Sequence, residues 1–483
     1  MKSNYKLSLL FLVWLIAAGC LCIPGGLPKM ELPDASKTPS QSSKPAALKT
    51  RQPSVTKTIA SPSAPSISDN GLNSQAPWLI IASENSLWAA NPDGSGLQKI
   101  VENRLATKLG AAIQPGGSRV AVITSDSDQI HNMALSLVTL PAGNVEKITD
   151  LTSSQTEKSA DANPGEPEFE AISAVNQADM AWSPDGKKLA FIGLMDGPSA
   201  DLYLYDTTSK KISRVTKDSS QNYQPIWSPD GKNIIVFGVE SFGTGGGLTM
   251  AGVWLVKGDG SNVKPLYDPK NSSGEIIIGW RGNTTAILTS WGMDCGEYQL
   301  RLFDISNAQT TIIQKDCTKA AASPTGTILY GDGKALYLLS SGGAEGKKEI
   351  RVAEGETNFI RWDTASSIFI AGLSGGKLIT FDTQGKNQQE TPEDNALNAA
   401  ARNGVWAWTS YNEPYPGVII SGPGMETGQI FTKNADVPIF DANKNLLFFA
   451  DKHLYRSTPP LYEFAIPLGA ISDVQEVIWL GEK

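Results

Sequence analysis

Two segments of the chain repeat one strand–turn–strand pattern, and this repeat limits the possible folds more than any other feature. Residues 180–191 read Met-Ala-Trp-Ser-Pro-Asp-Gly-Lys-Lys-Leu-Ala-Phe, and residues 225–237 read Pro-Ile-Trp-Ser-Pro-Asp-Gly-Lys-Asn-Ile-Ile-Val-Phe. In the turn, proline fixes φ, aspartate hydrogen-bonds the local backbone and glycine accepts a positive φ. Apolar strands at 201–206 and 212–216 complete the first unit. The pattern predicts four-stranded antiparallel units.

Weaker copies of this unit recur at a spacing of about 40 residues, which is typical of β-propeller blades. Their turns lie at 113–117, 278–283, 322–326, 360–363, 401–404 and 440–444. First strands are expected near positions 113, 181, 226, 279, 321, 361, 401, 440 and 478. The unit at 396–433 is the least regular, so the sequence predicts an all-β propeller of either eight or nine four-stranded blades.

The two ends of the repeated region predict how the ring closes. Residues 78–82 and 86–94 match strands two and three of a blade that lacks its first strand. Near the C-terminus, Trp479 takes the position that Trp182 and Trp227 have in the two clear units. We therefore expect the last strand to complete the first blade, which removes the open sheet edges of an unclosed array.

The Ser-Pro-Asp-Gly units resemble the WD40-like repeats of the TolB-type propellers. The resemblance covers nearly all of residues 77–483, and it is strong in two units and partial in the others. It implies a fold and says far less about function.

The N-terminal residues predict export. Lys2 and Lys6 precede an uncharged apolar run at 7–18, which is shorter than the ~20 residues of a membrane-spanning helix. Ala17-Ala18-Gly19-Cys20 resembles the bacterial lipobox, with alanine where leucine is usual. We expect residues 1–19 to be a signal peptide, Cys20 to be lipidated, and the exported chain to be held on the bacterial cell membrane by this lipid alone. An ordinary signal peptide cut nearby is the alternative.

Residues 20–76 are predicted to be a disordered linker between this anchor and the propeller domain, 77–483. Serine, proline, lysine, threonine and alanine dominate the stretch, and it has no apolar period. Such a segment buries too little apolar surface to offset the entropy of ordering it. Its lysines suit an anionic lipid surface, although a plain soluble spacer explains them equally well.

The two faces of the predicted ring differ in their connections. Turns between strands one and two and between strands three and four share one face, here called the tight-turn face. Connections between strands two and three and between blades share the opposite one, here called the loop-rich face. Long insertions fall on the loop-rich face, at 125–133, 152–178, 240–252, 291–298 and 411–417. We interpret the acidic stretch 152–178 as a solvated flexible loop, and capture of a basic partner is the alternative.

Loops on a rigid scaffold commonly carry binding residues, so the loop-rich face is the predicted binding face. Its candidates are aromatic and acidic: Phe242, Trp291, Asp294, Glu297, Tyr298, Tyr411, Glu413 and Tyr415. Aromatic rings with carboxylates bind protein segments, sugars or cationic groups, whereas rings that only pack their own loops are the alternative. Cys295 and Cys317 also reach this face. An exported chain permits disulfides, so we expect a bridge between Cys295 and Cys317, and two free thiols are the alternative.

Signals for catalysis are weak. Gly372-Leu-Ser374-Gly-Gly376 fits the nucleophile motif G-x-S-x-G, but it joins two predicted strands, so we interpret it as a hairpin. With only His131 and His453 in the chain, we expect neither a metal nor a cofactor. The net charge of −8 and the lack of a basic stripe argue against nucleic-acid binding.

The predicted function is therefore non-enzymatic binding of an envelope protein or glycan by a monomer. The alternative is a hydrolase or lyase of sugars or peptides, with Asp294, Glu297 and Glu413 as its acids.

Overall fold

The computed structural model describes residues 71–481 apart from several internal segments. The segments outside the described residues are 84–85, 103–111, 126–131, 153–165, 219, 242–248, 268–274, 291–299, 315–318, 342–348, 364–366, 387–388, 392–395, 411–415 and 426. The predicted signal peptide, Cys20 and nearly all of the predicted linker also lie outside this part of the chain.

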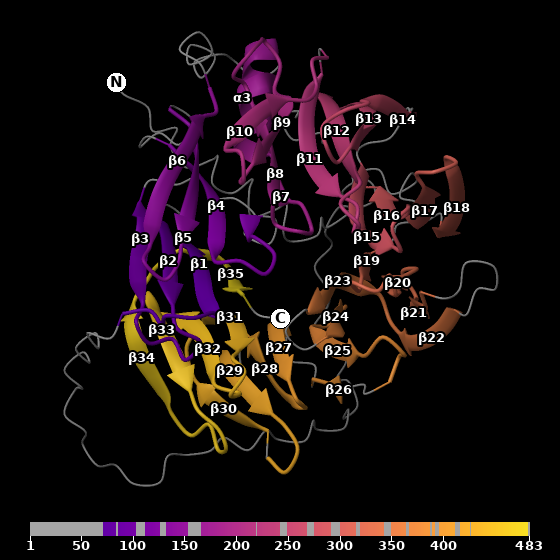
Figure 1. Ribbon diagram of the computed structural model, residues 1–483. Coiled ribbons are helices and arrows are strands. Elements are labelled where there is room, and N and C mark those ends of the chain that lie inside the picture. The colour runs from indigo at the N-terminus through magenta and orange to yellow at the C-terminus, as the bar shows by residue number, and fades with distance from the viewer. Residues whose placement is uncertain are drawn as a thin grey trace, which may run out of the picture.

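The chain forms a ring of nine blades, each an antiparallel sheet (Figure 1). Strands are given from the inner strand outward. Blade 1 is β35 (Val474–Leu480), β1 (Trp78–Ser83), β2 (Ser86–Ala90) and β3 (Gln98–Glu102); blade 2 is β4 (Arg119–Thr124), β5 (Ala134–Thr139) and β6 (Asn144–Asp150); blade 3 is β7 (Ala181–Trp182), β8 (Lys188–Gly193), β9 (Asp201–Asp206) and β10 (Lys211–Arg214).

The next three blades follow the same order. Blade 4 is β11 (Gln221–Trp227), β12 (Asn233–Ser241), β13 (Thr249–Lys257) and β14 (Lys264–Tyr267); blade 5 is β15 (Glu275–Arg281), β16 (Thr285–Ser290), β17 (Leu300–Asp304) and β18 (Gln309–Gln314); blade 6 is β19 (Ala320–Ala322), β20 (Ile328–Gly331), β21 (Ala335–Leu339) and β22 (Glu349–Glu354).

The last three blades complete the ring. Blade 7 is β23 (Thr357–Asp363), β24 (Ile368–Leu373), β25 (Lys377–Phe381) and β26 (Gln389–Glu390); blade 8 is β27 (Ala396–Arg402), β28 (Val405–Ser410), β29 (Gly417–Ser421) and β30 (Gly428–Phe431); blade 9 is β31 (Ala435–Phe440), β32 (Leu446–Ala450), β33 (His453–Ser457) and β34 (Ala465–Ala470). Of the two predicted blade counts, nine is confirmed, and the irregular unit at 396–433 is a complete blade.

Blade 2 has the shortest inner strand. Its place is taken by Ile113, which makes a single antiparallel bridge to Val120 of β4. The position near 113 therefore does begin a blade, as the sequence predicted.

The predicted closure of the ring is confirmed. β35 pairs antiparallel with β1, and Trp479 lies opposite Leu79. In Figure 1 the indigo strands of blade 1 accordingly lie beside the yellow strands of blade 9. Arg456 of blade 9 adds an ion pair to Asp93 of blade 1, with Nη1 at 2.9 Å from Oδ2. The first and last strands thus stabilise each other in one sheet, and the ion pair adds a contact across the interface between blades 9 and 1; an interface between neighbouring blades is here called a seam.

The core lies between blades, because each sheet packs both of its faces on its neighbours. Between blades 4 and 5, for example, buried Phe237 and Leu255 pack with Leu288 and Phe303. Alternating residues of one strand therefore serve two different interfaces, as the period of two in a strand requires.

Local hydrogen bonds explain why Ser-Pro-Asp-Gly forms a turn. In blade 3, Ser183 Oγ donates to Asp185 Oδ1 at 2.7 Å and accepts from the backbone N–H of Lys188 at 2.9 Å. Gly186 has φ +67°, which is costly for residues with a Cβ. Blade 4 repeats the arrangement at residues 228–231.

Tryptophan side chains join some blades to the preceding ones. The indole N–H of Trp182 donates to the backbone oxygen of Ala112 at 2.7 Å, and that of Trp227 donates to Ala181 at 2.9 Å. Ala112 and Ala181 occupy equivalent places in blades 2 and 3, so the two bonds are copies of one contact. The repeated tryptophan therefore fixes the spacing of neighbouring blades.

The next position along the inner strand can join a blade to the following one. Gln114 Nε2 donates to the carbonyl of Gly186 at 2.7 Å, and Arg281 Nη2 donates to that of Gly326 at 3.1 Å. Where this position is serine, as at Ser183, the side chain bonds its own turn instead. The choice of residue decides whether the turn is stabilised locally or across the seam.

One expectation about local structure was wrong. The acidic stretch 152–178, interpreted as a flexible loop, includes the helix α3 (Pro167–Gln177). Ala171, Ile172, Ala174 and Val175 are buried, so the helix packs a short apolar stripe on the propeller. The acidic residues of its first turn suit the positive end of the helix dipole. No helix of the described residues is long and apolar enough to span a membrane.

Candidate functional site

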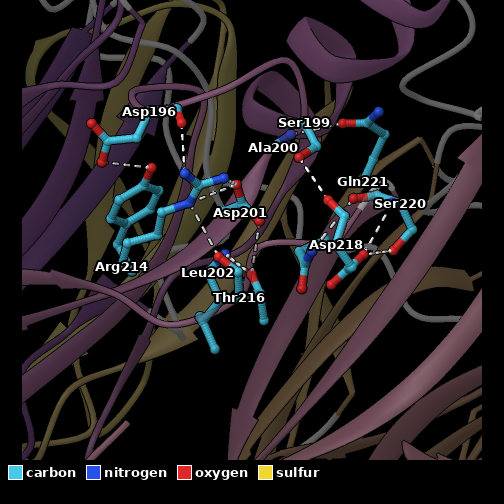
Figure 2. Close-up of polar contacts among 12 residues, drawn as sticks. Asp196, Ser199, Ala200, Asp201, Leu202, Arg214, Thr216, Asp218, Ser220 and Gln221 are labelled. Atoms are coloured by element: carbon cyan, nitrogen blue, oxygen red, sulfur yellow. Dashed lines mark hydrogen bonds and ion pairs between the residues drawn. The ribbon is translucent and has the colours of Figure 1, made fainter. Parts of the chain in front are cut away.

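A buried ion pair lies at the loop-rich end of blade 3 (Figure 2). Asp201 begins β9 and has no exposed surface, while Arg214 ends β10 and is 21% exposed. Asp201 Oδ2 accepts two hydrogen bonds from the guanidinium, from Nη2 at 2.6 Å and Nε at 3.0 Å. Its Oδ1 accepts one from Thr216 Oγ1 at 3.1 Å. Both carboxylate oxygens are therefore occupied by protein donors.

The environment of Asp201 opposes ionisation. Burial raises the pKa of this carboxyl from 3.8 to about 6, although Arg214 and Thr216 favour the charged form. Tyr203 also lies in the cluster and donates to Asp196 Oδ2 at 3.2 Å. Burial, followed by the charge of Asp196, raises the pKa of the Tyr203 hydroxyl well above its usual value.

The ion pair holds the loop between β8 and β9. Arg214 Nη1 donates to the carbonyl of Asp196 at 2.6 Å, and the hydroxyl of Ser199 donates to the carbonyl of Asp218 at 2.8 Å. The backbone N–H of Ala200 donates to Gln221 Oε1 at 2.8 Å. As Figure 2 shows, these bonds connect the 194–200 loop with the connection from β10 to β11. The arrangement positions loops, and Asp201 is a positioning residue.

Helix α3 lies on the same face. It packs against β8 and against β11, whose first residues Gln221 and Asn222 belong to the hydrogen-bonded network. The loop-rich end of blades 3 and 4 is thus a fixed platform of a helix, a loop and a connection.

The sequence placed Asp201 and Arg214 on strands but gave them no role. A charged residue at the start of an apolar strand, with an arginine on the next strand, was the available signal.

The predicted binding residues all fall outside the described residues, and so do the two cysteines. These are Phe242, Trp291, Asp294, Cys295, Glu297, Tyr298, Cys317, Tyr411, Glu413 and Tyr415. Their flanking strands are described: β12 and β13 flank 242–248, β16 and β17 flank 291–299, and β28 and β29 flank 411–415. Each is a connection between strands two and three of a blade, as predicted.

The tight-turn face carries a depression that the sequence did not predict. It has a volume of about 950 Å³ and lies between blades 3 and 4. Two Ser-Pro-Asp-Gly turns line it, together with four lysines and four aspartates: Lys187, Lys188, Lys232, Lys257, Asp185, Asp206, Asp230 and Asp259. A hydrogen bond from Ser183 lowers the pKa of Asp185. The lining is therefore balanced in charge, which explains why it gave no signal in the sequence.

The G-x-S-x-G segment is a hairpin, as predicted. It joins β24 to β25, which pair antiparallel, and Ser374 Oγ donates to Glu356 Oε2 at 3.2 Å. His453 lies in blade 9, where its Nδ1 is 2.8 Å from the carbonyl oxygen of Asp451. Within the described residues, no three histidine, cysteine, aspartate or glutamate side chains are grouped to hold a metal ion.

Comparison with known proteins finds short matches. The chain is 41% identical over 58 residues to an uncharacterized peptidase, YuxL, of Bacillus subtilis, which is 12% of this chain and 9% of that protein. It is 34% identical over 53 residues to the Tol-Pal system protein TolB of Alcanivorax borkumensis, which is 11% of this chain and 12% of that protein. The chain thus spans a small fraction of the curated relatives it matches. No family model matches.

Solved structures with similar folds include TolB from Acinetobacter baumannii, at 19% identity and a TM-score of 0.32, covering 59% of this chain and 65% of that one. Another is an oligogalacturonate lyase from Vibrio parahaemolyticus, at 9% identity and a TM-score of 0.42, covering 82% of this chain and 97% of that one. The turn repeats, the four-stranded blades and the match to a TolB sequence agree with one another. The chain is a nine-bladed β-propeller, and one stretch of 53 residues is similar in sequence to a TolB protein.

Proposed function

We propose that this chain is an exported, lipid-anchored binding module, and that its loop-rich face binds an envelope protein or glycan. The observation that carries the proposal is the platform at blades 3 and 4. There the Asp201–Arg214 pair and helix α3 fix loops on the face to which the long connections open. A fixed loop binds at a lower entropic cost than a mobile one.

The anchor is supported by the sequence of the first 20 residues. A charged start, a short apolar run and a cysteine after small residues are what an exported lipoprotein requires. With Cys20→Ser, we expect the chain to leave the membrane fraction while its propeller remains folded.

The binding face is tested by photo-crosslinking in cells. A photoreactive residue is placed at Phe242, Trp291, Tyr411 or Tyr415 on the loop-rich face, and at Lys187 or Lys232 on the tight-turn face as matched controls. We expect one recurrent envelope partner from the first group and none from the second. Equal crosslinking from both faces would show that the face was assigned wrongly.

Turnover of a sugar or peptide substrate by the purified protein would contradict a purely binding role. Alanine at Asp294, Glu297 and Glu413 together then shows whether the acids of the loop-rich face carry that activity.

A further inference from the structure

Exposed apolar side chains are concentrated in one turn of blade 9. Seven large apolar residues are substantially exposed in the described part of the chain, and three lie within 461–466. These are Leu461 at 50%, Phe464 at 68% and Ile466 at 48% exposure, here called the apolar strip. The other four are spread over blades 2, 4, 5 and 6: Val145, Val263, Ile312 and Ile350. Clusters of exposed apolar residues commonly mark interaction sites, whereas single ones need no explanation.

The turn that carries the strip is fixed from within. Tyr462 is 1% exposed, and its hydroxyl donates to the carbonyl of Lys444 at 2.6 Å. Its ring meets that of Phe440 edge to face. Burial raises the pKa of the Tyr462 hydroxyl to about 12. Since Tyr462 points inward, its neighbours Leu461 and Phe464 are held outward, and the strip cannot collapse onto its own blade without losing this contact.

The strip borders the seam with blade 1. Ile466 lies opposite Arg456 in the β33–β34 register, and cross-strand partners point to the same side of a sheet. Arg456 Nη1 binds the Asp93 carboxylate at 2.9 Å and the Asp93 carbonyl at 3.1 Å. Ile466, at one end of the strip, is therefore adjacent to the turn between β2 and β3, on the tight-turn face.

That same turn holds the start of the described chain. The backbone N–H of Asn73 donates to Asn91 Oδ1 at 2.7 Å, and Asn91 Nδ2 donates to the carbonyl of Gly71 at 3.4 Å. The chain that leads back to Cys20 thus leaves the propeller beside the apolar strip.

We infer that the apolar strip docks on the lipid bilayer in which Cys20 is anchored. The inference rests on the proposed lipid anchor. Residues 20–71 separate the proposed anchor from the described propeller, and a second contact with the bilayer would set the orientation of the ring. A tether raises the effective concentration of the strip at the membrane, so a small apolar surface suffices. The exposed acid Glu463 lies in the same turn and is repelled by anionic lipid, so the proposed contact is apolar rather than electrostatic.

Docking by the strip sets the orientation of the ring. The edge of blades 9 and 1 on the tight-turn face lies against the lipid, and the loop-rich face points away from it. The loop-rich face would then bind a partner that approaches from the side away from the anchoring membrane.

The test measures amide hydrogen exchange of residues 458–466 in the full lipidated chain. The protein is bound to vesicles of phosphatidylethanolamine and phosphatidylglycerol and compared with the Cys20→Ser chain free in solution. We expect exchange about tenfold slower on vesicles, unchanged by added salt. The variant L461S/F464S/I466S should lose this protection. Its control, V145S/I312S/I350S, removes three exposed apolar residues from other blades and should keep the protection.

The outcomes are distinct. Equal exchange on vesicles and in solution, with lipid present on Cys20, overturns the docking and leaves the anchored binding module intact. Loss of protection in both triple variants also overturns it. Protection of the Cys20→Ser chain without vesicles at high concentration assigns the strip to a second copy instead. A mass that shows no lipid on Cys20 removes the anchor itself, and with it this inference. Thermal unfolding of both triple variants shows that the propeller is intact.

Discussion

The tryptophan at the end of a first strand has two environments in this ring. Trp182 and Trp227 donate to carbonyls of the preceding blade, at 2.7 and 2.9 Å. Among the residues described, the indole nitrogens of three others are buried without a hydrogen-bond partner: Trp280, Trp362 and Trp479. An unmade bond leaves the desolvation cost of the buried group unbalanced. Equivalent residues therefore contribute unequally to stability.

Substituting Trp182→Phe and Trp362→Phe separates the hydrogen bond from the ring. Both variants make the same change to the ring, but only Trp182→Phe leaves a buried carbonyl, that of Ala112, without its donor. We expect Trp182→Phe to lower the free energy of unfolding by about 1–2 kcal/mol more than Trp362→Phe. Chemical denaturation of both variants measures the difference. Equal losses would mean that the indole bond contributes nothing net.

Asp201 predicts a pH dependence of stability. The pKa of its carboxyl is raised in the folded state, from 3.8 to about 6. Its contribution to the free energy of unfolding is therefore fully present below pH 4 and is lost as the pH rises through 6. Compared with Asp201→Asn, the wild type should lose on the order of 2 kcal/mol between pH 4 and pH 7. Denaturation of both proteins across this range measures the change. An opposite slope would show that Arg214 outweighs burial and lowers the pKa.

At the scale of elements, turns were predictable and packing partners were not. The Ser-Pro-Asp-Gly turns were found because serine, aspartate and glycine act within a few residues of one another. Helix α3 was missed because its buried stripe is four small or medium residues inside an acidic stretch. The Trp182 and Gln114 bonds depend on how one blade meets the next, and no local pattern encodes that.

The predicted Cys295–Cys317 disulfide would tie two connections of the loop-rich face. Cys295 lies between β16 and β17, and Cys317 lies between β18 and β19. We expect the unreduced protein to yield one cross-linked peptide, and reduction to lower the free energy of unfolding by ~3 kcal/mol. A Cys295→Ser/Cys317→Ser chain should match the reduced wild type. Alkylation of both thiols before reduction would contradict the bridge.

At the scale of the whole molecule, the first and last strands share one sheet. Closure was predictable because an incomplete first blade and an extra last strand both show in the sequence. The blade count was left open because one unit has poor repeat signals, although its strands pair regularly. For the candidate site, the sequence predicted the loop-rich face and a set of residues on it. Those residues lie outside the described part of the chain, so their positions stay a prediction.

Ending the chain at Ser472 should show how much this closure contributes. The truncation removes β35 and exposes the inner edge of β1, including buried Ile80 and Ile81. We expect loss of the soluble monomer and of a cooperative thermal transition, because an open apolar edge recruits other chains. A chain that ends at Gly481 retains β35 and is the control. Normal unfolding of the shorter chain would show that the seam of blades 9 and 1 holds without a shared sheet.

The pairing of β1 with β35 also sets the order in which the protein can be completed. β1 ends at Ser83, whereas its partner runs from Val474 to Leu480, almost the whole length of the chain later. A chain made from its N-terminus onward holds a first blade with a missing strand until β35 has been made. If the chain crosses a membrane in that order, the propeller stays open during translocation. The ring closes only when β35 reaches the far side and pairs with β1.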